Sequence, residues 1–350
     1  MSWLKLDRRG VRGLVLSGVA AGLATGVWSL GAPGPDTSTS SGCPRWSHND
    51  PCRSRKRVEK SASLFSSLAN RGPDDRVDIE CLPEVPPETP SPRTYYRAIP
   101  ALFPVRNLET LGDGSFRVAS PALADYEGDE RLCDDEVFAH QPRGAHCGAA
   151  LVAPRTVVAA AHCISSGQLP EYSVVFDFIV RAGDPASLGV IAADSVCWPA
   201  DEPRLVIEGK LAIFDIKCPE GFVEPPVLTV ADLPPREGEL VYGIGYPQKL
   251  PAKFTGFEPV RRFGADGAYR YFTADLDLFP GNSGSPILDL NHKLVGIAES
   301  DASSVMCDDI AQRCRRWAGC AGSCGSDVKI TPVNTLGEVL LARTRTEDGG

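Results

Sequence analysis

The sequence lacks an excess of positive charge. It contains 36 lysines and arginines against 45 aspartates and glutamates, which gives a formal net charge of −9 at pH 7. Because contacts with phosphate groups need a basic protein surface, this balance argues against a general binder of nucleic acids or of anionic membranes. The chain also lacks internal repeats with a period of about 20–50 residues, which argues against a repeat architecture.

Cysteine and turn-forming residues, by contrast, are plentiful. The 350 residues include 12 cysteines, 34 glycines and 30 prolines. An even and high cysteine count is typical of disulfide-bonded proteins outside the reducing cytosol. Many glycines and prolines favour turns and short strands over long helices. With 43% hydrophobic and 23% charged residues, the chain has enough apolar side chains to bury a core.

The N-terminus has the pattern of an export signal. A basic stretch (Lys5, Arg8, Arg9 and Arg12) precedes a run without charged residues at positions 13–35. This pattern predicts a signal peptide at 1–32, or a membrane anchor if it stays uncleaved. We expect a leader, propeptide or linker at 33–93 and the folded domain at 94–350.

After Tyr95 the sequence changes to short runs of β-branched and aromatic residues separated by glycine, proline, aspartate and asparagine. This texture predicts an all-β fold built as barrels or a sandwich. Near the C-terminus, Thr331 and Pro332 predict the start of a helix, because proline fits the first helical turn. Its apolar stripe would be Val333, Leu336, Val339 and Leu340.

Two segments carry residues suited to acyl transfer. The first, 147–163, reads as a strand pair that ends in AAAHC, so that a Cys147–Cys163 bond would fix the imidazole of His162. The second is PGNSGSP, in which glycines flank Ser283 and free the backbone to turn. The N–H groups of Gly281 and Ser283 would then form an oxyanion hole beside the serine hydroxyl.

The motifs AAAHC and GNSGSP, about 120 residues apart in this order, resemble those of chymotrypsin-like (trypsin-like) serine peptidases. The spelling FPGNSGSPIL followed by LVGI resembles the bacterial glutamyl-endopeptidase-like branch. The resemblance implies two six-stranded antiparallel β-barrels with a junction near 228–239, and a site in the cleft between them. His162 would be the general base and Ser283 the nucleophile. The resemblance also implies a bacterial endopeptidase that is secreted or located in the cell envelope. We expect a monomer that acts on protein or peptide substrates and needs no cofactor or metal.

The third member of the expected triad is missing from its position. The family's aspartate opens a strand that here reads KLAIFDI, so Lys210 stands in its place. A cation opposes formation of the imidazolium. Glu208, with a bulge at Gly209, is one substitute; Asp215 points to the opposite strand face, and Asp177 is more remote in the sequence. A pseudopeptidase that acts as a binding module is therefore the alternative function, and a disulfide-bonded envelope protein without a site is the third.

The residues expected around the specificity pocket do not favour one substrate. The resembling branch binds a glutamate side chain with a hydroxyl residue and a histidine, but Leu278 and Ala298 stand at those positions. Asp277 matches the position that selects basic residues in trypsin-type pockets. The simpler interpretation, which we favour slightly, is that Asp277 is an outward-facing polar residue.

The remaining cysteines allow several pairings. Cys197 and Cys218 can bracket the strand that holds Lys210, and Cys81 can pair with Cys133. Four more cysteines crowd one segment, where two disulfides are expected rather than a zinc site; they are Cys307, Cys314, Cys320 and Cys324.

Overall fold

The structure of the protein is a computed structural model. The structure describes residues 76–82, 90–122, 124, 132–133, 138–164, 169–181, 188–299, 306–309, 314–317 and 328–347. The predicted signal peptide and most of the predicted leader lie outside these residues.

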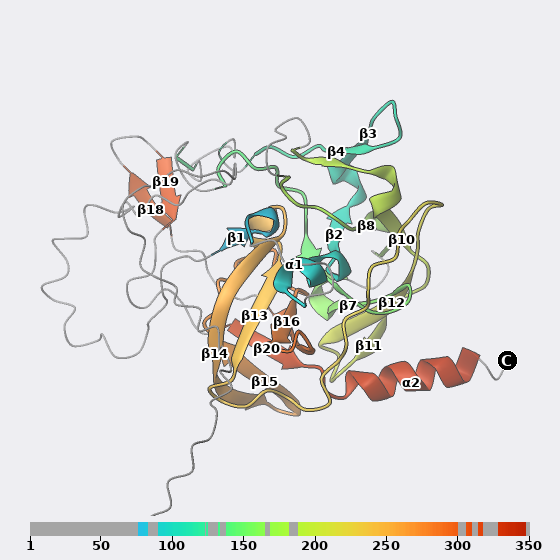
Figure 1. The fold of residues 1–350 in the computed structure, drawn as a ribbon, viewed down its shortest axis with the longest axis vertical. Helices are drawn as coiled ribbons and strands as arrows, with labels where there is room; N and C mark the ends of the chain where they lie inside the picture. The colour runs from blue at the N-terminus through green and yellow to red at the C-terminus, as the bar shows by residue number, and fades with distance from the viewer. Residues whose placement is uncertain are drawn as a thin grey trace, which may run out of the picture. The chain divides into compact units, whose positions relative to one another are not determined.

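The C-terminal half forms a closed antiparallel barrel. Strand order is β1-β14-β13-β16-β17-β20-β15, and β14 also pairs with β15, which closes a ring of six strands. The strands are β1 (Val77–Asp78), β13 (Leu240–Gly245), β14 (Lys253–Asp266), β15 (Tyr269–Ala274), β16 (Pro286–Asp289), β17 (Leu294–Glu299) and β20 (Val328–Pro332). Figure 1 shows β14, β13, β16, β20 and β15 grouped in this sheet.

The N-terminal half forms a second, nearly closed barrel of order β5-β2-β8-β10-β12-β7-β6, with β11 paired to β12. The strands are β2 (Ala101–Pro104), β5 (Cys147–Gly148), β6 (Ala150–Ala153), β7 (Thr156–Ala160), β8 (Tyr172–Val175), β10 (Val196–Pro199), β11 (Arg204–Val206) and β12 (Leu211–Lys217). Only Ala149 separates β5 from β6, so one bent segment pairs with both β2 and β7. The two barrels confirm the all-β prediction.

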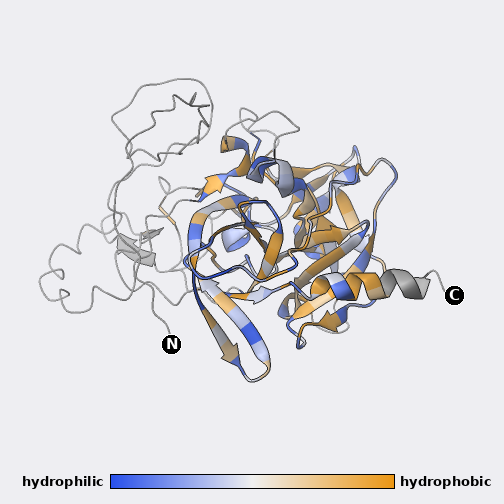
Figure 2. Ribbon diagram, turned by 60° about the horizontal axis from the view of Figure 1, so that its bottom comes forward, coloured by the Kyte–Doolittle hydropathy of each residue, from blue (hydrophilic) through white to orange (hydrophobic). Residues whose placement is uncertain are grey.

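Smaller elements surround the barrels. They are the strands β3 (Leu108–Thr110), β4 (Phe116–Val118), β9 (Val190–Ile191), β18 (Met306–Asp309) and β19 (Cys314–Trp317), and the helix α1 (Pro92–Tyr95). Short 3₁₀ turns occur at Ile79–Cys81, Tyr96–Ala98, Val105–Asn107, Ala161–Cys163, Leu169–Glu171, Ala193–Ser195 and Pro247–Lys249. In Figure 2, hydrophobic residues concentrate on the strands and hydrophilic ones on many of the connecting turns, as expected for strands packed around a core.

The segment that connects the barrels contacts both of them. The N–H of Leu228 donates to the carbonyl of Leu151 in β6, and the N–H of Ala231 donates to the carbonyl of Leu294 in β17. Residues 228–231 thus pass from one sheet to the other close to the junction proposed from the sequence. The domain boundaries themselves stay predictions.

The C-terminal helix exists but starts later than predicted. Pro332 ends β20, and α2 (Leu336–Glu347) begins four residues further on. The segment 328–332 is a strand because it pairs on both sides, with β15 and with β17, and this pairing outweighs the local helix-start signal. All four residues of the predicted stripe contact the core, but Val333 precedes the helix: Val333 and Leu336 are buried, and Val339 and Leu340 pack against the core.

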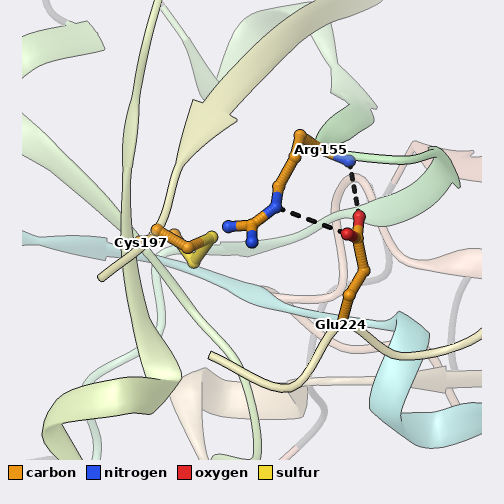
Figure 3. The surroundings of a disulfide bond; sticks show 4 residues. Arg155, Cys197 and Glu224 are labelled. Carbon is orange, nitrogen blue, oxygen red and sulfur yellow. Dashed lines mark hydrogen bonds and ion pairs between the residues drawn. A yellow bond between two sulfur atoms is a disulfide. The ribbon is translucent and has the colours of Figure 1, made fainter. Parts of the chain in front are cut away.

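Disulfides join distant parts of the fold. Cys197 in β10 is bonded to Cys218, directly after β12, as the spacing suggested. Beside this bond, in Figure 3, the carboxylate of Glu224 accepts from the backbone N–H of Arg155 at 2.8 Å. It also lies 3.4 Å from the Nε of the same arginine. Glu224 therefore holds the β6–β7 turn, where Arg155 has a positive φ of 56°.

Two cysteine predictions are wrong. Cys133 is bonded to Cys314, not to Cys81, which is itself disulfide-bonded. Because Cys314 is used in this way, the four cysteines of that segment can form neither two bonds among themselves nor a four-cysteine zinc site. The pairing connects residues 181 positions apart, which sequence spacing does not indicate.

No helix among the described residues has the length and apolar character needed to cross a membrane.

Candidate active site

The serine motif forms a tight turn before β16. The N–H of Asn282 donates to the carbonyl of Phe279, and the N–H of Ser285 donates to the carbonyl of Asn282, each at 2.9 Å. Gly284 donates to the carbonyl of Ala298 in β17, also at 2.9 Å. The turn is therefore fixed to the barrel on the side that follows Ser283, which is 8% exposed.

Two glycines of this motif are required by their surroundings. Gly281 and Gly284 have φ values of +103° and +82°, which L side chains rarely adopt. A Cβ on Gly284 would lie 2.2 Å from the carbonyl oxygen of Gly148, and one on Gly281 would lie 2.5 Å from that of Tyr246. The glycines thus allow the turn to pack directly on neighbouring backbone.

The histidine motif forms the 3₁₀ turn Ala161–Cys163 at the end of β7, in the other barrel. His162 is exposed, while Cys163 is buried and bonded to Cys147 as predicted. On the opposite side, the N–H of Ala161 donates to the carbonyl of Lys210 at 2.8 Å. The turn that carries His162 is therefore fixed by a disulfide and by a strand neighbour.

Backbone contacts bring the two motifs together. The N–H of Gly148 donates to the carbonyl of Ser283 at 2.8 Å, and the preceding residue, Cys147, is bonded to Cys163 next to His162. A Cβ on Gly284 would also lie 3.1 Å from the backbone nitrogen of Ala160 in β7. The residue after Ser283 and the strand before His162 are thus in contact, although they belong to different barrels.

We expect removal of the Cys147–Cys163 bond to affect both stability and the site. The double variant Cys147→Ser/Cys163→Ser opens a loop of 16 residues, which should lower the free energy of unfolding by about 2–4 kcal/mol. Urea unfolding measures this loss. The matched control, Cys197→Ser/Cys218→Ser, opens a loop of 21 residues away from His162. In this control we expect a comparable loss of stability but full reactivity of Ser283. Equal reactivity of Ser283 in both double variants would contradict a role of the Cys147–Cys163 bond in positioning His162.

The acid candidates lie in different surroundings. Glu208 is exposed in the turn between β11 and β12, where Ile207, Glu208 and Gly209 all have positive φ, so Gly209 forms part of a hairpin turn rather than a bulge. Asp215 in β12 accepts from the hydroxyl of Thr156 at 2.7 Å. Asp177 pairs with Arg97 at 3.8 Å.

The three residues proposed for specificity are buried. Leu278 and Ala298 are fully buried, and Asp277 is only 8% exposed. The interpretation of Asp277 as an outward-facing polar residue is therefore wrong. Its role as a determinant of substrate preference stays a prediction, as do the catalytic roles of His162, Ser283 and the N–H of Gly281.

Residues 147–297 match the family model of the trypsin-like peptidase domain. This match supports a chymotrypsin-like serine peptidase. The matched segment contains both motifs, AAAHC and GNSGSP, and most strands of both barrels. It does not distinguish the glutamyl-endopeptidase-like branch from others. No curated protein matches the sequence.

Solved structures that match part of this chain include the HtrA-type protease AlgW with a decapeptide. It is 15% identical, the alignment covers 71% of this chain and 65% of that one, and the TM-score is 0.40. Another is Rv3671c from M. tuberculosis H37Rv in an inactive form, at 15% identity, with 76% and 100% of the two chains covered and a TM-score of 0.39. At this identity and these TM-scores, neither structure informs the activity or partners of this chain.

The folded part of the chain has an N-terminal contact that the sequence did not predict. Strand β1, within the segment predicted to be a leader, pairs with β14. The preceding residue, Arg76, is fully buried: its guanidinium donates to the Oε1 of Gln248 at 2.5 Å and lies 4.1 Å from the ring centroid of Phe279. Phe279 is four residues before Ser283. The signal in the sequence was only a short Arg-Val-Asp-Ile stretch, too short to identify as a strand.

This contact extends to the proposed oxyanion hole. The backbone N–H of Gln248 donates to the carbonyl of Pro280 at 2.7 Å. Because a trans peptide is planar, the N–H of Gly281 in the same peptide points away from Gln248. Arg76 and Gln248 therefore fix the orientation of the peptide whose N–H is proposed to bind the oxyanion.

Proposed function

We propose that this chain is an exported serine endopeptidase that cleaves protein or peptide substrates with Ser283 and His162. The observation that carries this proposal is the contact between the two motifs. The backbone carbonyl of Ser283 accepts from the N–H of Gly148, and the neighbouring Cys147 is bonded to Cys163 beside His162. Disulfides support an oxidising compartment. The predicted signal at 1–32 would direct export, with a membrane contact only if it stays uncleaved.

In the proposed reaction, the hydroxyl oxygen of Ser283 attacks the scissile carbonyl while its proton passes to the imidazole of His162. The negative charge that develops on the carbonyl oxygen is stabilised by the N–H groups of Gly281 and Ser283. The imidazolium then returns the proton to the leaving amine, which departs and leaves an acyl group on Ser283. Water, activated by the same imidazole, hydrolyses the ester and restores the serine.

The glutamyl-endopeptidase-like branch is a finer proposal that rests on the spelling of the serine motif. Fully buried, apolar Leu278 and Ala298 offer no polar group to a glutamate side chain, so we do not expect a preference for glutamate. Asp277, which precedes Leu278 and is also buried, would instead favour a substrate with a basic side chain.

A second candidate function is a pseudopeptidase that uses the fold as a binding module. The observation in its favour is Lys210, which the sequence aligns with the position of the family's acid. The backbone carbonyl of Lys210 accepts from the N–H of Ala161, beside His162. In the Ser-His-Asp mechanism, replacing the aspartate by its amide lowers kcat about 10⁴-fold, so a lysine alone would leave little activity.

Labelling with a fluorophosphonate distinguishes the two functions. We expect the purified protein to form a covalent adduct at Ser283, because only a serine activated by a base reacts rapidly with this probe. The adduct is located by mass spectrometry of the digested protein. Ser283→Ala should remove labelling, whereas Ser285→Ala, two residues away in the same turn, serves as the control for probe specificity. A folded protein that remains unlabelled would support the pseudopeptidase.

A further inference from the structure

Glu299 is the last residue of β17 and lies next to the serine turn. The preceding residue, Ala298, accepts the N–H of Gly284 at 2.9 Å, and β17 contacts β7, the strand that leads to His162. The side chain of Glu299 is 12% exposed. A largely buried carboxylate thus sits at the boundary between the two motifs.

Lys210 approaches the same carboxylate from the other barrel. Its backbone carbonyl binds Ala161, the neighbour of His162, and its Nζ lies 3.9 Å from the Oε2 of Glu299. The Nζ also lies 4.5 Å from the ring centroid of Tyr269. Glu299 therefore forms an ion pair with Lys210, the residue at the position expected for the family's acid. The negative charge of Glu299 balances the positive charge of Lys210.

The carboxylate of Glu299 is held by a second set of contacts. Its Oε1 accepts from the hydroxyl of Thr331 at 2.9 Å, and that hydroxyl lies 3.1 Å from the phenol oxygen of Tyr269. Burial is the main cause of the raised pKa of the Tyr269 phenol; the hydrogen bond with Thr331 opposes this effect, and the charge of Glu299 adds to it. The phenol therefore stays neutral and able to donate a hydrogen bond. Such contacts fix a carboxylate in one orientation while one of its oxygens remains available for a further donor.

We propose that Glu299 is the positioning residue of this site: its carboxylate orients His162 and stabilises the imidazolium, in place of an acid at position 210. The inference rests on the proposed function. The proton of Ser283 passes to one ring nitrogen of His162, while the N–H of the other ring nitrogen donates to Glu299. Glu299 stays ionised throughout, so the proton goes from the imidazolium to the leaving amine.

The electrostatic reason is that an anion near the imidazolium lowers its free energy, and a cation raises it. Near the turn of His162 lie His146, whose pKa is lowered by burial and by the charges of Lys249, His162 and Arg106, and Lys210, whose backbone carbonyl accepts from Ala161. Glu299 brings a negative charge to Lys210. Removing this charge should therefore slow the reaction.

Glu299→Gln keeps the size of the side chain and its acceptor for Thr331 but removes the charge. We expect kcat/KM on a peptide or ester substrate to fall about 10²–10⁴-fold, with the loss mainly in kcat. The matched control is Asp215→Asn, which also converts a carboxylate that accepts from a threonine hydroxyl, but far along β12 from Lys210.

Two further variants separate positioning from a purely structural role of the ion pair. Lys210→Met breaks the same pair but leaves the carboxylate, so kcat/KM should rise. Glu299→Gln/Lys210→Asp moves the carboxylate to the family's position and should recover at least about tenfold over Glu299→Gln, since the acid's whole contribution is about 10⁴-fold.

The inference is wrong if Glu299→Gln loses no more activity than Asp215→Asn. It is also wrong if Glu299→Gln and Lys210→Met lose activity equally, because both variants break the ion pair but only Glu299→Gln removes the carboxylate. If Glu299→Gln does not fold, a loss of activity in folded Lys210→Met contradicts the inference. Absence of fluorophosphonate labelling in the parent protein would instead refute the proposed function itself, so the two failures are distinguishable.

Discussion

Replacing Lys253 by methionine should be the most destabilising of the single substitutions considered for this protein. Lys253 in β14 is fully buried, and its Nζ lies 2.7 Å from the Oδ1 of Asp78 in β1. The same nitrogen donates to Gln141 at 2.8 Å, and Gln141 donates to the other oxygen of Asp78 at 3.0 Å. Lys253→Met leaves a buried carboxylate without its counter-ion, which should cost about 3–5 kcal/mol of unfolding free energy.

Urea unfolding with intact disulfides measures this cost. The control is Lys293→Met, because Lys293 forms an exposed pair with Asp232 at 4.0 Å, with side chains 44% and 93% exposed. Exposed pairs contribute about 0–1 kcal/mol, so Lys293→Met should change little. The double variant Lys253→Met/Asp78→Leu removes both buried charges and should regain most of the loss. Equal effects of Lys253→Met and Lys293→Met would show that the buried pair does not anchor β1.

The sequence predicted those parts of the fold that depend on local pattern. Alternation and turn residues gave the strands, and the small-residue segments around His162 and Ser283 identified the two turns that the structure brings into contact. The Cys147–Cys163 pair followed from the strand pair between its cysteines. Each of these features is determined within a short stretch of chain, where residue spacing is informative.

The features that the sequence did not predict depend on contacts between distant segments. Cys133 pairs with Cys314 across 181 positions, and Pro332 ends a strand because two neighbouring strands pair with it. Glu299 follows the residue already considered for specificity, but its relation to Lys210 is visible only when β12 and β17 are placed in space. Arg76 belongs to the segment 33–93, which the sequence predicted to be a leader, propeptide or linker.

Arg76→Met tests whether this N-terminal contact supports the site. Arg76 binds Gln248, whose backbone N–H fixes the carbonyl of Pro280 and so orients the N–H of Gly281. Without the guanidinium, Gln248 loses its side-chain partner and the 280–281 peptide is less firmly oriented. Because loss of one oxyanion donor lowers kcat by about 10²–10³-fold, we expect a fall of about 10²-fold in kcat with a smaller change in KM.

The comparison that decides this prediction is with Arg93→Met. Arg93 also binds the N-terminal segment, through the carboxylate of Glu80 at 3.0 Å and the carbonyl of Leu82 at 3.1 Å, whereas Arg76 binds Gln248. If β1 only adds stability, the two variants should retain similar kcat once both are shown to be folded. If Arg76 orients the oxyanion peptide, kcat should fall in Arg76→Met but not in Arg93→Met. Arg76→Lys should recover only part of the lost kcat. A lysine keeps the cation over the ring of Phe279 but lacks the planar donor group that reaches Gln248.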